Sequence, residues 1–281
     1  FPQTQTLFTY STDRGLVISQ PGRDLQKAVI FGIRPCDARS FPILDLMFKD
    51  EIVYPYYVEA RERLTLIGLS CIPPWQNCFC TSVNGNPGST EGLDILLTDL
   101  DGKFFVEVLS PKGQVLIDEN PDLFSKATEE DKTAKKEVIG QAIANIKRKI
   151  DILDISGLLG TIFDHDFWKQ MSDKCIGCGT CTYLCPTCHC FDMQDEIKGM
   201  EGRRVRMWDS CMFSEYTIHT SGHNPRPART NRLRNRVFHK FKYYPDNFDE
   251  TLCVGCGRCI DACPVNVDIV DILAGVREVT V

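Results

Sequence analysis

The chain has 281 residues, of which 43% are hydrophobic and 25% are charged, and its formal net charge is −6. This composition is ordinary for a folded globular protein and excludes a disordered chain, and the length favours two domains. The acidic balance argues against a protein that binds nucleic acid through its overall charge, and no apolar stretch approaches the roughly 18 residues of a membrane helix.

The N-terminal part, residues 1–150, is predicted to form a mixed α/β domain. The apolar run at residues 27–33 indicates a short buried strand. A helix is expected after it that starts near Ser40, so that Pro42 falls in the first turn, where its missing N–H costs little. A second apolar run, at residues 64–69, leads directly towards Cys71.

The remainder of this domain is expected to hold a hairpin and a closing helix. Residues 93–97 and 104–109 flank the pair Asp101–Gly102, which is typical of a tight turn between two strands. Residues 129–149 are charged, with apolar residues at helical spacing.

Residues 151–281 are predicted to form an α-helical, ferredoxin-like domain. Short helices are expected at residues 163–171 and 268–276. The stretch 81–174 contains no cysteine, which favours a domain boundary between the cysteines of the first third and those that follow.

Fifteen cysteines are the unusual feature of the composition. The number is odd, so complete pairing into disulfides within the chain is impossible, and the chain is long enough to build a core without them. No secretory signal is visible at the start of the sequence. The cysteines therefore read as metal ligands in a reducing compartment, and a cytoplasmic protein is expected.

Two copies of one cysteine motif carry the chemistry. Residues 175–186 read CIGCGTCTYLCP and residues 253–264 read CVGCGRCIDACP, and both follow the spacing C-x2-C-x2-C-x3-C-P of two-cluster ferredoxins. In that pattern the fourth cysteine of each motif ligates the other cluster. One predicted [4Fe–4S] cluster takes Cys175, Cys178, Cys181 and Cys263. The second takes Cys253, Cys256, Cys259 and Cys185.

The residues around the motif cysteines fit this interpretation. Gly177, Gly179, Gly255 and Gly257 let backbone N–H groups approach the cluster, and the fourth cysteine is expected to begin a helix. Zinc sites built from C-x2-C pairs are the alternative, but a zinc site does not require the additional C-x2 spacing or the Cys-Pro pair that ends the motif. The motifs begin 78 residues apart, which favours a long helical insertion and the α-helical ferredoxin arrangement.

Four further cysteines lie in the N-terminal domain: Cys36, Cys71, Cys78 and Cys80. Each is expected in a loop after an apolar run, where four thiols suffice for a third [4Fe–4S] cluster. Asp37 could supply an oxygen ligand if one thiol is out of reach. The alternative is that these cysteines are buried free thiols.

Two other features remain open at this point. Cys188, Cys190 and Cys211 either bind metal with His189 or pack beside the clusters. The basic stretch 226–242 has seven Arg or Lys and no acid. It could raise the potential of a nearby cluster, dock a partner, bind nucleic acid or form a solvated helix face.

Phosphate-binding glycine loops and the common hydrolase motifs are missing from the sequence. We therefore expect no dinucleotide or flavin site, and no catalytic residue, on this chain.

These motifs give the chain a family resemblance. The segments FGIRPCDARS, NCFCTS, CIGCGTCTYLCPTCHCFD, RMWDSC, GHNPRPAR and CVGCGRCIDACP resemble the iron–sulfur electron-transfer subunit of anaerobic sulfite reductases and the related beta subunit of cytoplasmic sulfhydrogenases. The resemblance extends along nearly the whole chain, from FPQTQTLF onwards, and members of the family carry a further segment before that point.

The resemblance implies an iron–sulfur electron-transfer protein without catalytic residues of its own. It implies one partner that binds flavin and NAD(P)H, and a catalytic partner of the sulfite reductase, hydrogenase or heterodisulfide reductase type. It also implies that the four early cysteines belong to a redox site. The alternative function is an enzyme subunit whose N-terminal cluster has an open ligand position.

Overall fold

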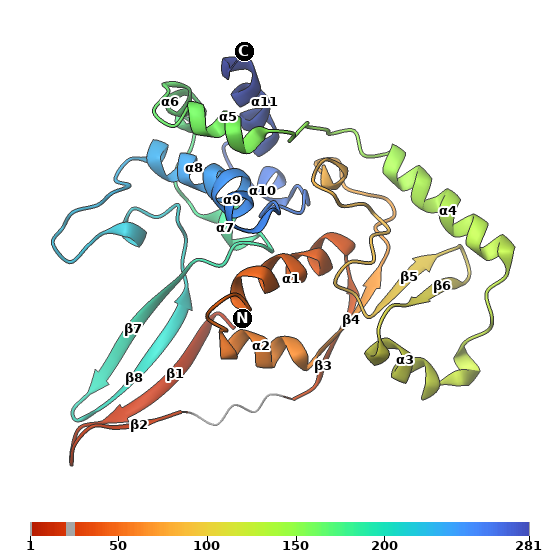
Figure 1. Ribbon diagram of the computed structural model, residues 1–281, viewed down its shortest axis with the longest axis horizontal. Coiled ribbons are helices and arrows are strands. Elements are labelled where there is room, and N and C mark those ends of the chain that lie inside the picture. Colours follow the sequence, from red (N-terminus) through yellow and green to blue (C-terminus); the bar gives the residue numbers. More distant parts are fainter. Residues whose placement is uncertain (1, 21–25, 281) are drawn as a thin grey trace.

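Residues 2–20 and 26–280 are described by the computed structural model, which contains two four-stranded sheets and a group of short helices (Figure 1). The predicted mixture of helices and strands is confirmed. No helix among the described residues combines the length and the apolar character needed to cross a membrane.

The first sheet joins the start of the sequence to the segment between the two motifs, and it is antiparallel throughout, in the order β2-β1-β8-β7. Its strands are β1 (Thr4–Ser11), β2 (Val17–Ser19), β7 (Phe191–Lys198) and β8 (Glu201–Trp208). Because β1 pairs with β8, this sheet crosses the domain boundary predicted near residue 150, and that boundary stays a prediction.

The hairpin β7–β8 corrects the expectation that the segment between the two motifs is helical. Gly199 lies at the turn with φ +64°, and Arg204 pairs across the strands with Asp195 at 2.7 Å. Strand β7 is almost entirely exposed, and both strands carry several charged residues, so an apolar pattern could not reveal them.

The second sheet has the order β3-β4-β5-β6 and belongs to the N-terminal part. Its first three strands are parallel and the last pair is antiparallel. The strands are β3 (Ala28–Ile33), β4 (Leu64–Leu69), β5 (Ile95–Asp99) and β6 (Phe104–Val108). The apolar run at residues 64–69 forms β4, and the predicted hairpin around Asp101 is confirmed.

Strand β3 was expected to be buried, and the structure contradicts this. It is the edge strand of the sheet, and Val29 and Phe31 are 55% and 73% exposed. A parallel strand buried on both faces is also apolar along its length, so the sequence cannot distinguish the two positions.

The helix after β3 begins earlier than expected. Helix α1 (Pro35–Phe48) starts at Pro35, so Pro42 lies inside it and cannot donate to the carbonyl of Ala38. That carbonyl instead faces Gly92, which has φ +80° and no room for a Cβ. Cys36 therefore lies in the first turn of a helix rather than in a loop.

The other helices are mostly short. The predicted closing helix forms but ends at Ala144, and the helix expected over 163–171 begins four residues later. Helices of the N-terminal part are α2 (Pro55–Glu62), α3 (Pro111–Asp118) and α4 (Glu129–Ala144). Those that follow are α5 (Ile155–Thr161), α6 (Phe167–Ser172), α7 (Thr180–Tyr183), α8 (Arg229–Phe238), α9 (Tyr244–Phe248), α10 (Arg258–Asp261) and α11 (Ile269–Thr280).

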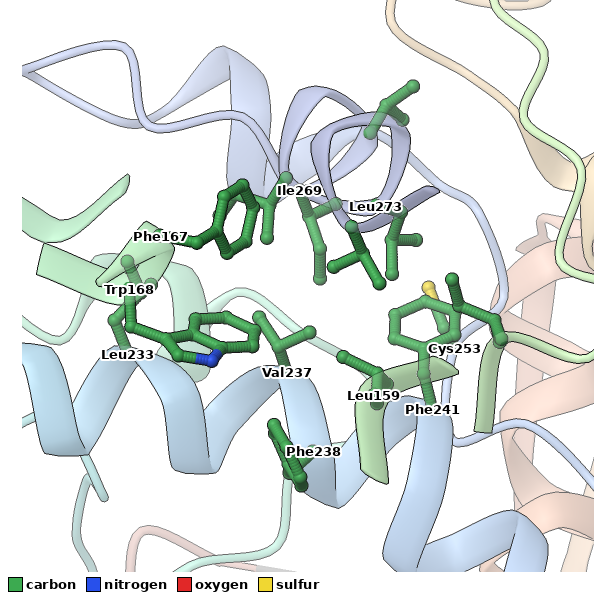
Figure 2. Packing of buried hydrophobic residues seen from close by; sticks show 14 of the residues in the cluster. Leu159, Phe167, Trp168, Leu233, Val237, Phe238, Phe241, Cys253, Ile269 and Leu273 are labelled. Atoms are coloured by element: carbon green, nitrogen blue, oxygen red, sulfur yellow. The ribbon is translucent and has the colours of Figure 1, made fainter. Parts of the chain in front are cut away.

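The largest hydrophobic core lies among the C-terminal helices. Figure 2 shows Trp168 packed beside Leu233 and Val237 of α8, with Leu273 of α11 facing them. Cys253 lies at one end of this core, so the second cysteine motif starts from a rigid, apolar base.

Helix α1 ties the N-terminal part to this core. Arg39 is 2% exposed and pairs with Glu91 at 2.9 Å and with Glu250 at 3.0 Å. Ile43 of the same helix packs against Leu252 and Val254, beside the second motif. Cys36 and Cys256 are thereby brought to the same region of the molecule.

Candidate metal centre

Each cysteine motif folds as a loop followed by one turn of helix. Gly177, Gly179, Gly255 and Gly257 all have φ between +64° and +77°, which favours glycine. The fourth cysteine follows the short helix in both motifs, since α7 ends at Tyr183 and α10 at Asp261. The expectation that it begins a helix is therefore wrong.

A first cavity lies between the two motifs. Its wall includes apolar side chains such as Met212 and Leu233, which exclude water. The backbone N–H of Val267 donates to Cys263 Sγ at 3.1 Å. The motif cysteines that line this cavity are Cys175, Cys178, Cys181, Cys259 and Cys263.

A second cavity lies beside the first and is also lined by both motifs. Phe79 of the N-terminal part contributes to its wall. Burial raises the pKa of the Cys253 thiol to about 12, and nearby Lys240 opposes that rise. The motif cysteines that line this cavity are Cys185, Cys253, Cys256 and Cys259. Each cavity therefore contains three cysteines of one motif and the fourth cysteine of the other.

Arg236 lies in the wall that the two cavities share. It is 5% exposed, and its Nε has no hydrogen-bond partner among the described residues. A buried guanidinium without a carboxylate is costly unless an anion lies nearby. Four thiolates around a cluster provide such negative charge, so the donor set and the orphaned N–H both fit [4Fe–4S] groups.

No three His, Cys, Asp or Glu side chains in residues 2–20 and 26–280 converge closely enough to hold a single metal ion. A cubane spreads its four thiolates over four irons, so its ligands surround a volume instead of meeting at a point. The motif cysteines surround two cavities in this way, which fits the ligand sets of two such clusters.

The four early cysteines gather around the loop that follows β4. Cys78 and Cys80 are buried, and Cys71 and Cys36 are partly exposed. The thiol of Cys71 interacts electrostatically with the other three, and this contributes to the raised pKa values of Cys36, Cys78 and Cys80. Burial is the larger cause in each case, and for Cys80 the pKa rises to about 12.

Arginine side chains lie beside the early cysteines and beside the second motif. Arg34 donates to Cys71 Sγ at 3.3 Å, and Arg258 Nε donates to Cys256 Sγ at 3.4 Å. Arg258 also pairs with Asp37. The carboxylate of Asp37, considered above as a substitute ligand, is thus already held by a cation.

The loop that carries Cys78 and Cys80 is in direct contact with the second motif. The backbone N–H of Phe79 donates to the carbonyl of Gly255 at 2.8 Å, and Cys78 Sγ lies 3.7 Å from the carbonyl oxygen of Cys256. A Cβ on Gly255 would lie 2.5 Å from the Cα of Cys80. The approach of these two loops therefore depends on glycine at this position.

We expect Gly255→Ala to destabilise the protein much more than Gly199→Ala. Both glycines have φ +64°, but Gly199 has open space around it. Alanine at 199 should cost only the left-handed strain of about 1 kcal/mol, whereas the overlap at 255 should add about 1–3 kcal/mol. Anaerobic denaturant unfolding of both variants measures the difference, and equal losses would contradict the tight contact.

The remaining cysteines line neither cavity among the described residues. A hydrogen bond with Cys211 lowers the pKa of Cys190 to about 6. Cys188 lies beside Cys185, and His189 Nδ1 lies 3.0 Å from the carbonyl of Thr187. Cys211 belongs to the largest hydrophobic core, and Cys190 packs against that core.

Part of the basic stretch 226–242 is buried beside the two cavities. Arg232, Arg236 and Lys240 are buried. By contrast, Arg234 and Lys242 pair with carboxylates at the surface. A solvated helix face therefore does not describe three of the seven cations, and sequence spacing alone did not reveal which ones turn inward.

Comparison with known proteins agrees with this geometry. The 4Fe–4S dicluster domain family matches residues 174–267. Sulfhydrogenase 2 subunit beta of Pyrococcus furiosus is 36% identical over 254 residues, which cover 90% of this chain and 75% of that protein. No solved structure matches the chain. The chain thus carries a 4Fe–4S dicluster domain in its C-terminal part.

Proposed function

Since the chain belongs to the family of the sulfhydrogenase beta subunit, we propose that it relays electrons through [4Fe–4S] clusters inside an anaerobic redox complex. One cluster would be held by Cys175, Cys178, Cys181 and Cys263. The second would be held by Cys253, Cys256, Cys259 and Cys185. A third would be held by Cys36, Cys71, Cys78 and Cys80.

The pair of adjoining cavities is the observation that carries this proposal. Each contains a full set of four motif cysteines, and Cys259 and Arg236 lie in the walls of both. When bound, [4Fe–4S] clusters supply one-electron transfer at low potential. The protein's own contribution is to hold the thiolates, exclude water with apolar walls and balance the charge with Arg236.

A relay is favoured over substrate chemistry by the thiols of the N-terminal part. The thiol of Cys71 lies within electrostatic reach of the other three, which suits a cluster with all four positions closed. The contact of Cys78 with the carbonyl of Cys256 would make this third cluster a neighbour of the second.

The partners follow from what a relay requires. A chain of clusters accepts and passes single electrons, so a flavin subunit that oxidises NAD(P)H would have to supply them. A catalytic subunit of the hydrogenase, sulfite reductase or heterodisulfide reductase type would consume them. The relative is itself named as one subunit of a sulfhydrogenase. A cytoplasmic location is proposed because 15 thiols require a reducing compartment.

The function is tested on the full chain purified without oxygen. Iron and sulfide should be present in equal amounts, and dithionite should produce the electron paramagnetic resonance signals of reduced [4Fe–4S] clusters, which an oxidised viologen dye should then abolish. No flavin should be released, because the sequence offers no phosphate-binding glycine loop. Stoichiometric flavin, or zinc in place of iron, would contradict the proposal.

A further inference from the structure

Lys240 lies against the second set of cysteines. It is 2% exposed, and its Nζ donates to Cys185 Sγ at 3.2 Å, Thr187 Oγ1 at 3.1 Å and the carbonyl of Leu252 at 2.8 Å. These three bonds use all three protons of the ammonium group. Its position in the π-helical turn His239–Tyr243, directly after α8, carries it into the core.

No carboxylate compensates this buried charge among the described residues. The hydrogen-bond partners of Lys240 are the sulfur of Cys185, the hydroxyl of Thr187 and the carbonyl of Leu252, a set of three acceptors that fits an ammonium with all three protons in place. Its counter-charge would be the thiolate of Cys185, a member of the second set.

The contact is specific to one cavity. Lys240 lines the second cavity and does not line the first, whereas Arg236 lines both. Near the first cavity, Arg229 and Arg232 donate to the carbonyls of Cys175 and Met212, not to a cysteine sulfur. An ammonium hydrogen-bonded to a ligand sulfur therefore distinguishes the second set.

We propose that Lys240 raises the reduction potential of the cluster held by Cys253, Cys256, Cys259 and Cys185, and leaves the cluster of the first cavity nearly unchanged. The inference rests on the proposed function. Reduction adds one electron to the cluster, and a fixed positive charge on a ligand sulfur stabilises the more negative, reduced form.

A higher reduction potential would keep the transferred electron on the second cluster, which lies between the other two cluster sites. The second cavity shares Arg236 and Cys259 with the first, and its Cys256 carbonyl touches Cys78 of the third group. A cluster at this position that is easier to reduce receives electrons from either side.

The test compares Lys240→Gln with Lys240→Arg in the anaerobic full chain. Glutamine keeps a hydrogen-bond donor but removes the charge, and arginine keeps both. Potentiometric titration followed by electron paramagnetic resonance should show the second cluster about tenfold harder to reduce in Lys240→Gln, which corresponds to about 59 mV for one electron. The arginine variant should stay near the wild-type potential. The signals are assigned with Cys178→Ser and Cys256→Ser.

Lys242→Gln is the matched control, because Lys242 is close in sequence but pairs with Asp246 at 3.0 Å. It should leave both potentials unchanged. If Lys240→Gln lost the second cluster while Lys240→Arg kept it, the result would also support a requirement for positive charge at this position. An unchanged potential in Lys240→Gln, an equal shift of both clusters, or loss from both Lys240 variants would overturn the inference. Absence of iron from the wild-type chain would instead refute the proposed function.

Discussion

Iron analysis of the anaerobically purified chain is expected to give about twelve irons, and about eight in Cys78→Ser, because each [4Fe–4S] cluster contributes four. Cys78 is buried against the second motif, where solvent-derived ligands have poor access. Serine at this position would remove one of four thiols and leave the cluster open. The third cluster should then be lost while the other two remain.

Cys211→Ser is the matched control for this loss. Cys211 is buried and lines neither cavity of the described residues, so its replacement should leave about twelve irons. If the wild-type chain held only about eight irons and Cys78→Ser held the same number, the prediction of a third cluster would be wrong. The early cysteines would then be the buried free thiols that the sequence also allowed.

Sequence spacing could predict the parts of the centre that are local. The doubled motif predicted which cysteines belong together, and the two cavities bring those sets together with Cys259 common to both. Glycines within the motifs were expected from the close approach of backbone, and all four adopt positive φ. These features depend on residues a few positions apart.

The parts that sequence spacing missed depend on long-range packing. The sequence shows seven cations in one stretch, but their spacing could not show that Arg236 and Lys240 turn inward while Lys242 pairs with Asp246. The start of α1 at Pro35 was missed because Pro42 usually marks a first turn. In the folded chain the freed Ala38 carbonyl faces Gly92, which is far away in sequence.

The strands of the first sheet were also missed, because their pairing depends on charges and on long-range contacts. Residues of β7 and β8 pair charges across the hairpin, as Arg203 does with Glu196 at 2.6 Å, and they bury little apolar surface. Gly199 lies at the turn, but a single glycine does not predict a hairpin. Pairing of β1 with β8 was not visible in the sequence because it joins residues about 200 positions apart.

If the ligation is crossed, the fourth cysteine of each motif ligates the cluster of the other motif, and its replacement should abolish that other cluster. Cys263→Ser should abolish the cluster that Cys178→Ser abolishes, although Cys263 belongs to the second motif. Cys185→Ser should abolish the cluster that Cys256→Ser abolishes. The reason is geometric, because Cys263 lines the first cavity with Cys175, Cys178 and Cys181, whereas Cys185 lines the second.

Each of the four variants should lose about four irons and one distinct paramagnetic signal, and the pattern of paired losses is what the experiment measures. Cys211→Ser again serves as the control that changes a cysteine without changing a cavity wall. If Cys185→Ser and Cys178→Ser abolished the same signal, the ligands would not be crossed. Each motif would then hold its own cluster, and Lys240, through Cys185, would act on the first cluster instead of the second.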